Sequence, residues 1–137
     1  MRLGIVASRF NGKIAAELLK RAQDAARQLG VESSVVSVPG ALEIPVTLQW
    51  MAQSGRFDAL AAVGVVIRGE THHFEIVANE SARGVMDVSL ECGLPIANGI
   101  LTTEDEPQAL ARLDKGAEAV RVAVEMARLK QGMHENP

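Results

Sequence analysis

The segment 59–67 places the strongest constraint on how this chain folds. Its sequence, ALAAVGVVI, is an almost continuous apolar run that ends at Arg68 and Gly69. Such a run is typical of a strand that is covered on both faces, as strands are in a parallel sheet. Because parallel neighbours need crossover connections, the segment predicts a sheet with helices on both sides.

Strand-like and helix-like segments alternate four times along the chain. Gly30 would close the first helix, and Pro45 is tolerated in the first turn of the second. This order predicts an α/β fold with three layers, α/β/α, in a flavodoxin-like arrangement around a four-stranded parallel sheet. At 137 residues we expect one domain, with residues 131–137 frayed at its end. Strands are expected at 3–7, 31–38, 59–67 and 96–101, and helices at about 14–29, 42–53, 72–91 and 107–130.

Composition and charge exclude several classes of function. Hydrophobic residues make up 47% of the chain, which argues against disorder. A net charge of −3 and an aromatic content of 3% predict no nucleic-acid partner, since such surfaces need basic patches and stacking rings. No apolar stretch approaches the ~20 residues that span a bilayer, so no membrane partner is expected. Cys92 is the only cysteine, which excludes an intramolecular disulfide and fits a cytoplasmic location.

The last expected helix carries apolar residues on more than one side. One stripe can cover the sheet, whereas the second needs another partner. Self-association explains the second stripe better than a fully enclosed helix in a monomer does. The first stripe is Leu113, Ala117, Val120, Val124 and Ala127, and the second is Ala119, Val122, Ala123, Met126 and Leu129.

The loop that follows residues 59–67 combines groups suited to a phosphorylated substrate. Ligands of open parallel sheets bind beyond the carboxyl ends of the strands, where this loop lies. Amides at a helix start can hold an anion, and a histidine beside them can move protons. The loop reads RGETHHF over residues 68–74. No complete nucleotide-binding fingerprint is present, which argues against a dinucleotide or ATP enzyme.

Several segments, in order over nearly the whole chain, resemble the 6,7-dimethyl-8-ribityllumazine synthase family. The most specific are the P-G-A-x-E-I-P segment at 39–45 and the R-G-E-T-x-H-F segment at 68–74. The resemblance implies a transferase that condenses 5-amino-6-ribitylaminouracil with 3,4-dihydroxy-2-butanone 4-phosphate, releasing phosphate and water. It also implies two small-molecule substrates, no metal, no organic cofactor, and a homo-oligomer built on pentamers with sites between subunits. The remaining segments lie at 8–11, 64–67, 79–80, 101–103 and 115–119.

The resemblance implies a pyrimidine and ribityl pocket from three loops. Phe10 would stack on the pyrimidine ring, with an aromatic that plugs the core edge as the alternative. Glu43 would accept hydrogen bonds from the ribityl chain, with an ordinary first-turn carboxylate as the alternative. The full set implied for this pocket is Phe10, Asn11, Gly40, Ala41, Leu42, Glu43, Val65, Val66, Ile67 and Asn98.

The resemblance also implies a phosphate cradle and a proton carrier. Gly69, Glu70 and Thr71 would hold the phosphate, although Thr71 alone also fits an N-cap. His73, immediately before the aromatic, would be the base. Arg68 is not implied as the main phosphate ligand and is interpreted as a structural charge or as one that lies behind the ligand-binding groups. His72 points about 100° away from its neighbour on a helix and is expected at the surface.

Two basic residues and one amide are implied to complete a neighbouring subunit's site. Arg112 and Lys115 would reach the neighbour's phosphate, and Asn98 would take the place of an aromatic beside the pyrimidine. An exposed helix arginine and a polar strand residue remain the alternatives for Arg112 and Asn98.

Three other readings of the chain compete with this one. A zinc site would need His72, Glu75 and a third ligand such as Cys92, without any paired ligand spacing. A non-catalytic flavin- or pterin-binding module would not need His73 beside a phosphate cradle. A shell-forming relative of the enzyme would assemble yet give no product.

Overall fold

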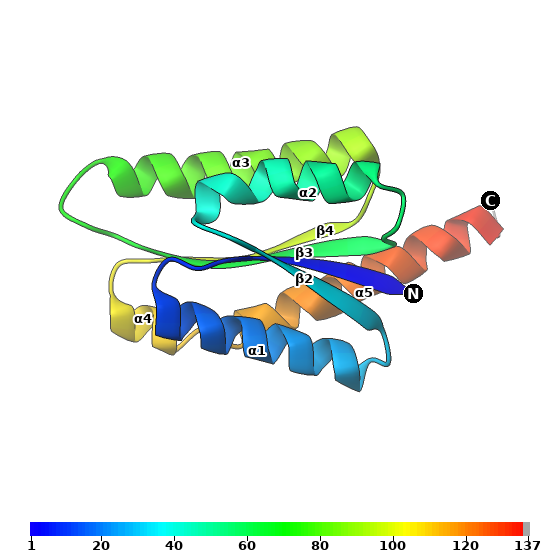
Figure 1. Cartoon of the computed structure of the whole chain (residues 1–137), viewed down its shortest axis with the longest axis horizontal. Coiled ribbons are helices and arrows are strands. Elements are labelled where there is room, and N and C mark those ends of the chain that lie inside the picture. The colour runs from blue at the N-terminus through cyan, green and yellow to red at the C-terminus, as the bar shows by residue number, and fades with distance from the viewer. Residues whose placement is uncertain (136–137) are drawn as a thin grey trace.

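The computed structural model describes residues 1–135 as a parallel sheet between two layers of helices (Figure 1). The sheet has the order β2-β1-β3-β4, and every neighbouring pair is parallel. This confirms the predicted three-layer α/β/α fold. In chain order the elements are β1 Arg2–Ser8, α1 Gly12–Gln28, β2 Glu32–Val38, the 3₁₀ helix η1 Ala41–Glu43, α2 Ile44–Gln53, β3 Ala59–Ile67, α3 His73–Cys92, β4 Ile96–Thr103, α4 Glu106–Leu110 and α5 Lys115–Glu135.

The central strand β3 alternates its side chains between two cores. Its residues 59, 61, 63 and 65 face the layer formed by α1 and α5. Leu60, Ala62 and Val66 face the layer formed by α2 and α3. Because both faces are covered, the strand is apolar at every position, as the sequence predicted.

The structure corrects the expected course of the C-terminal region. We expected one helical stretch over about 107–130, but the chain forms two helices, α4 and α5, separated by a turn. In this turn the amides of Arg112 and Lys115 donate to Ala109 and Arg112 carbonyls, each at 3.0 Å. We also expected residues 131–137 to be frayed, whereas residues 131–135 belong to α5, which is helical to Glu135. The last two residues, 136 and 137, lie outside the described residues.

Other element boundaries differ by a few residues. The second helix begins as a 3₁₀ turn at Ala41, one residue earlier than expected, and β4 extends to Thr103. This extension carries the fourth strand to the same edge of the sheet as Ile67, its partner in the register. None of the helices within residues 1–135 combines the length and apolar character needed to cross a membrane.

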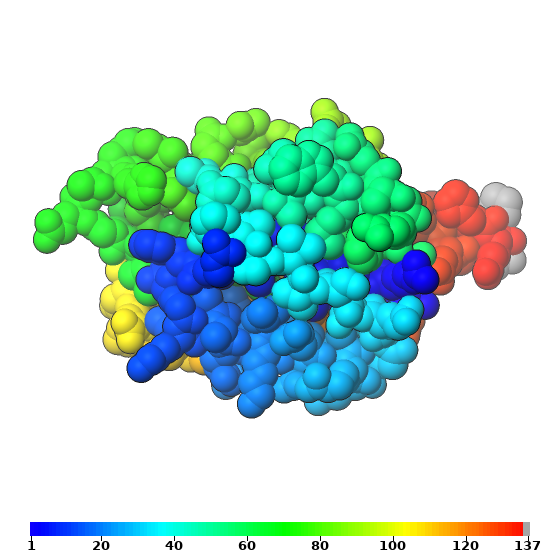
Figure 2. Space-filling view, in the orientation of Figure 1, coloured from blue at the N-terminus to red at the C-terminus, as the bar shows by residue number. Residues whose placement is uncertain are grey.

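The two-sided character of the last helix is visible in the burial of its residues. Every member of the first stripe is buried. In the second stripe Ala119 and Ala123 are buried, whereas Val122, Met126 and Leu129 are exposed by 46%, 43% and 54%. Helix α5 covers the sheet with one side and extends beyond the body of the molecule at its end (Figures 1 and 2). An apolar strip on its other side therefore remains available to a partner.

Candidate active site

A cavity of about 490 Å³ opens at the carboxyl edge of the sheet. Three loops and the first turns of α3 enclose it, which is where ligands of open α/β sheets bind. Ten of the thirteen lining residues lie at the end of β3 or in the loops that follow β1, β2 and β3. The other three, His73, Phe74 and Val77, belong to the first turns of α3. The lining residues are Phe10, Gly40, Ala41, Leu42, Glu43, Val65, Val66, Ile67, Gly69, Thr71, His73, Phe74 and Val77.

The loop after β1 carries an exposed aromatic ring at the cavity. The amide of Phe10 donates to the Pro39 carbonyl at 3.2 Å, so this loop is fastened to the loop after β2. The Phe10 side chain is 71% exposed, which an aromatic that plugs the core would not be. The ring is therefore free to offer one face to a flat ligand.

Asn11 supports this loop instead of lining the cavity. Its backbone has a φ of 65° in the left-handed region, which asparagine tolerates better than most residues. Its side-chain amide donates to the Val65 carbonyl at 2.9 Å. The predicted role of Asn11 in substrate binding stays a prediction, and the observed contact is with the protein.

The loop after β2 brings a carboxylate close to a small residue. The Glu43 amide donates to the Gly40 carbonyl at 3.1 Å and closes a turn. A Cβ atom built at Gly40 would lie 3.1 Å from the Glu43 carboxylate, so a larger residue there would crowd it. Ala41 is buried, while Leu42 and Glu43 are exposed at the cavity.

The end of β3 offers unpaired main-chain groups to the cavity. Pairing between β1 and β3 stops at Ala7 and Val63, whereas pairing with β4 continues to Ile67. Main-chain groups of successive residues face opposite neighbours along a parallel strand. The Arg68 amide bonds to Thr103 on the β4 side, so the amide and carbonyl of Ile67 face the open side. The main chain of Val66 faces β4, and its side chain lines the cavity.

The loop between β3 and α3 exposes a series of free amides. It protrudes from the body of the molecule (Figure 2), and Gly69 and Thr71 line the cavity. Within residues 1–135, the main-chain amides of residues 69–72 donate no hydrogen bond to a protein acceptor. Thr71 Oγ1 accepts from the His73 amide at 3.3 Å, as a residue near a helix start does. Free amides before a helix suit an anion, because the positive end of the α3 dipole adds to their attraction.

The two adjacent histidines lie in different surroundings. His73 lines the cavity with Gly69 and Thr71. The His72 side chain is 82% exposed and has Glu75 as its neighbour, with 3.8 Å between Nδ1 and Oε2. Of the pair, the structure therefore places only His73 at the cavity.

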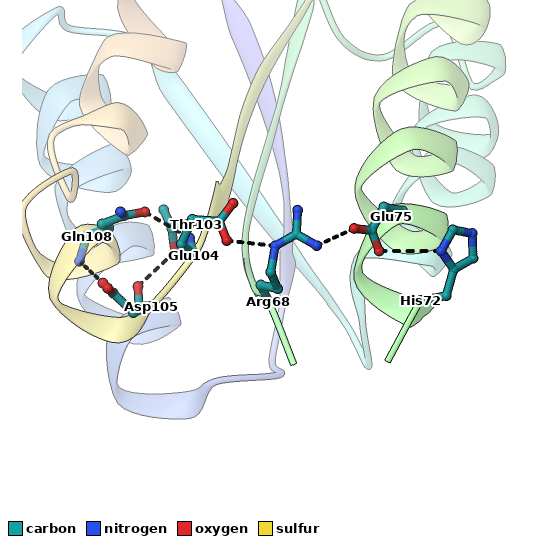
Figure 3. A network of polar contacts seen from close by, with 7 residues as sticks. All are labelled: Arg68, His72, Glu75, Thr103, Glu104, Asp105 and Gln108. Carbon is teal, nitrogen blue, oxygen red and sulfur yellow. Dashed lines mark hydrogen bonds and ion pairs between the residues drawn. The ribbon is translucent and has the colours of Figure 1, made fainter. Parts of the chain in front are cut away.

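Arg68 connects three segments around this loop (Figure 3). Its Nη1 donates to the Glu75 carboxylate, and its Nε donates to the Glu104 carboxylate at 2.7 Å. Its guanidinium carbon lies 4.4 Å from the centre of the Phe74 ring. The hydrogen bond from Arg68 lowers the pKa of the Glu75 carboxyl, and the same two carboxylates raise the pKa of Arg68.

Besides Asn11, four of the predicted site residues do not line this cavity. Asn98 and Lys115 line a second hollow of about 270 Å³ between α3, β4 and α5. Arg112 and Lys115 line a third, of about 330 Å³, at the end of β4. Glu70 lies on the exposed loop without lining any of the three. All of them except Glu70 thus lie at the free edge of β4.

Sequence reasoning missed Phe74 and Val77 as lining residues. Val77 follows His73 by four positions, so one helix face carries both, and this spacing could have found it. The sequence marks Phe74 only as the last residue of the R-G-E-T-x-H-F segment. The zinc alternative fails, because Cys92 ends the long helix that His73 begins, and residues 1–135 hold no cluster of three metal-ligating side chains.

Comparisons with known proteins agree on one family. A family model described as 6,7-dimethyl-8-ribityllumazine synthase matches residues 1–131. A protein of that name from Azoarcus sp. (strain BH72) is 54% identical, over 94% of this chain and 85% of the relative. Relatives with the same name from Nitrosomonas europaea and Burkholderia vietnamiensis are 58% and 52% identical, over 93% and 98% of this chain and 80% and 82% of their own lengths.

Proposed function

Because this chain belongs to the 6,7-dimethyl-8-ribityllumazine synthase family, we propose that the cavity at the carboxyl edge of its sheet is the active site of that reaction. The enzyme is a transferase of riboflavin biosynthesis that condenses 5-amino-6-ribitylaminouracil with 3,4-dihydroxy-2-butanone 4-phosphate. The observation that carries the assignment of the site is the convergence of an exposed ring, free amides and one imidazole on a single cavity.

The pyrimidine binds beside Phe10. The exposed ring stacks on the heterocycle, while the open main-chain groups of Ile67 pair with its polar edge. The ribityl chain extends toward Ala41 and Glu43, where a carboxylate accepts hydrogen bonds from its hydroxyl groups. Leu42 and the side chain of Val66 complete the apolar wall.

The phosphate of the second substrate binds at the loop before α3. The free amides of residues 69–72 and the Thr71 hydroxyl donate to its oxygens. The amides and the helix dipole supply attraction without a metal ion. Holding the phosphate here places the ketone end of the substrate toward the pyrimidine and within reach of His73.

His73 moves the protons that the condensation requires. An amine of the pyrimidine substrate attacks the ketone carbonyl, and loss of water gives an imine. A proton then leaves carbon as phosphate departs, and closure of the second ring releases the product's final water. Each step transfers a proton at or beside a carbonyl carbon, and one positioned imidazole can serve all of them.

A homo-oligomer built on pentamers completes each site. Asn98, Arg112 and Lys115 cannot serve their own subunit's cavity, since they line hollows at the free edge of β4. A neighbour packed against this edge and against the exposed strip of α5 would receive Arg112 and Lys115 at its phosphate and Asn98 at its pyrimidine. The Arg112 guanidinium is held for this by a hydrogen bond to the Gln108 carbonyl at 2.9 Å.

One assay and one measurement test these proposals. Mixing the purified protein with both substrates should produce lumazine fluorescence, and the absence of product would refute the assignment. Light scattering at micromolar concentration should give the mass of a pentamer or a multiple of it. A monomer that turns over substrate would refute the shared site.

A further inference from the structure

We propose that Arg68 is a positioning residue that holds the phosphate-binding loop in its binding conformation through Glu75, Glu104 and Phe74. This inference rests on the proposed function, since it concerns the loop assigned to the phosphate. It assigns Arg68 a role in affinity for one substrate, which a residue that only stabilises the fold would not have.

The loop needs an outside support because its own contacts are few. Residues 69–72 are exposed, and within residues 1–135 their amides are not bonded to the protein. A segment with so few contacts orders itself only at a cost in conformational entropy. A ligand that binds such a loop loses affinity by that cost, unless other contacts in the protein already hold the loop in one conformation.

Arg68 fixes both ends of the loop at once. It directly precedes Gly69, and its main-chain amide donates to the Thr103 carbonyl at 2.9 Å. Its side chain reaches across the loop to Glu75 on the first turn of α3, as Figure 3 shows. The planar guanidinium also lies over the Phe74 ring, whose residue lines the cavity next to His73. The Arg68 guanidinium therefore sets the distance between the end of β3 and the start of α3.

The second carboxylate is itself anchored. Glu104 accepts from Arg68 Nε at 2.7 Å, and the Glu104 amide donates to Gln108 Oε1 at 2.8 Å. The main-chain amide of Gln108 in turn donates to Asp105 Oδ1 at 2.9 Å, and this bond caps the start of α4. Arg68 is thus tied to a segment with internal hydrogen bonds, and the loop takes its rigidity from that segment.

The contacts of Arg68 also argue against a direct phosphate ligand. Its Nη1 and Nε atoms face the carboxylates of Glu75 and Glu104, whose combined negative charge exceeds the single positive charge of Arg68. A guanidinium committed in this way offers little attraction to a further anion. Direct binding and positioning therefore make opposite predictions when the two carboxylates are removed.

The first experiment compares Arg68→Gln with Arg83→Gln. Arg83 is a matched control, because it also pairs with two carboxylates, Glu80 and Asp87, but lies further along α3. In Arg68→Gln we expect KM for the phosphorylated ketone and the inhibition constant of inorganic phosphate to rise together, by about 10-fold. KM for the pyrimidine should stay unchanged, and Arg83→Gln should change neither constant. Equal changes in both KM values, or no change, would overturn the proposal.

The second experiment uses Glu75→Ala/Glu104→Ala, which also serves if Arg68→Gln does not fold. Positioning predicts that the inhibition constant of inorganic phosphate rises in this variant, because the loop loses its support. A direct ligand predicts that it falls, because the charge of Arg68 is released, and that result would overturn the inference. Lack of lumazine formation by the wild-type enzyme would instead refute the proposed function, so the two failures are distinguishable.

Discussion

The side-chain amide of Asn11 donates to the main-chain carbonyl of Val65 at 2.9 Å. This hydrogen bond lies just beyond the last paired residues of β1 and β3, and it joins the loop that carries Phe10 to the central strand. Asn11 is also the only non-glycine residue within 1–135 with a positive φ. One residue thus turns the chain into α1 and ties the loop that carries the aromatic ring to β3.

Substitutions at Asn11 should separate these two roles. Asn11→Gly keeps the left-handed backbone and removes the hydrogen bond, so KM for the pyrimidine should rise with little change in thermal stability. Asn11→Ala should in addition lose about 1–2 kcal/mol of stability, because alanine is strained at this φ. Steady-state kinetics and thermal unfolding of both variants measure the difference. Unchanged pyrimidine KM in Asn11→Gly would show that the bond does not position Phe10.

Replacement of His73 should remove proton transfer and spare binding. We expect His73→Ala to lower kcat by about 10²–10⁴-fold, with less effect if the uncatalysed condensation contributes. KM values should change little, because in the proposed site the amides hold the phosphate and Phe10 holds the pyrimidine. His72→Ala is the matched control, since that exposed neighbour lies on the same turn. Wild-type turnover in His73→Ala would exclude the residue as the proton carrier.

The packing of α5 on α1 predicts a large difference between two glycines of one helix. A Cβ atom at Gly116 would lie 2.3 Å from the Leu18 carbonyl oxygen, a main-chain atom that cannot move away easily. Gly116→Ala should therefore cost about 1–3 kcal/mol of unfolding free energy. Gly132 on the same helix has open space around it, and Gly132→Ala should gain about 0.5–1 kcal/mol. Denaturant unfolding of the two variants tests this, and equal effects would contradict the close contact.

Acid should weaken the contact between Arg68 and Glu75 only at a pH below the usual pKa of a glutamate carboxyl group. The hydrogen bond from Arg68 lowers the pKa of Glu75 from its usual 4.5. A carboxyl with a lowered pKa in the folded state stabilises that state above its unfolded pKa, and this contribution is lost as the pH falls through the lowered value. The thermal midpoint of the wild-type enzyme should exceed that of Glu75→Gln by a constant amount above pH 4.5. The difference should shrink as the pH falls further, and a difference that grows in acid would contradict this origin.

The sequence predicted those parts of the enzyme that depend on local pattern. The apolar run 59–67 and the residue types at strand ends were sufficient to place β3 and most of the cavity lining. The turn between α4 and α5 was missed, because residues 107–130 read as continuous helix, whereas in the structure α4 packs on β4 and β3 and α5 packs on α1 and on the sheet. The bridge from Arg68 to Glu75 and Glu104 was also missed. It depends on how closely the ends of β3 and β4 and the start of α3 lie in space, which no spacing in the sequence encodes.

The free edge of β4 leads to the last prediction, which concerns assembly. Met86 on α3 and Val122 on α5 flank Asn98 in one hollow and are exposed by 59% and 46%. If a neighbour packs here, Met86→Glu buries a charge in the contact and should dissociate the oligomer. Activity should fall with the mass measured by light scattering, because each site would lose the neighbour's Arg112. Trp50→Glu is the control, since Trp50 is 64% exposed on α2, away from β4 and α5, and lines none of the three hollows. An assembly that survives Met86→Glu, or a dissociated subunit that keeps full turnover, would show that the site does not depend on this edge.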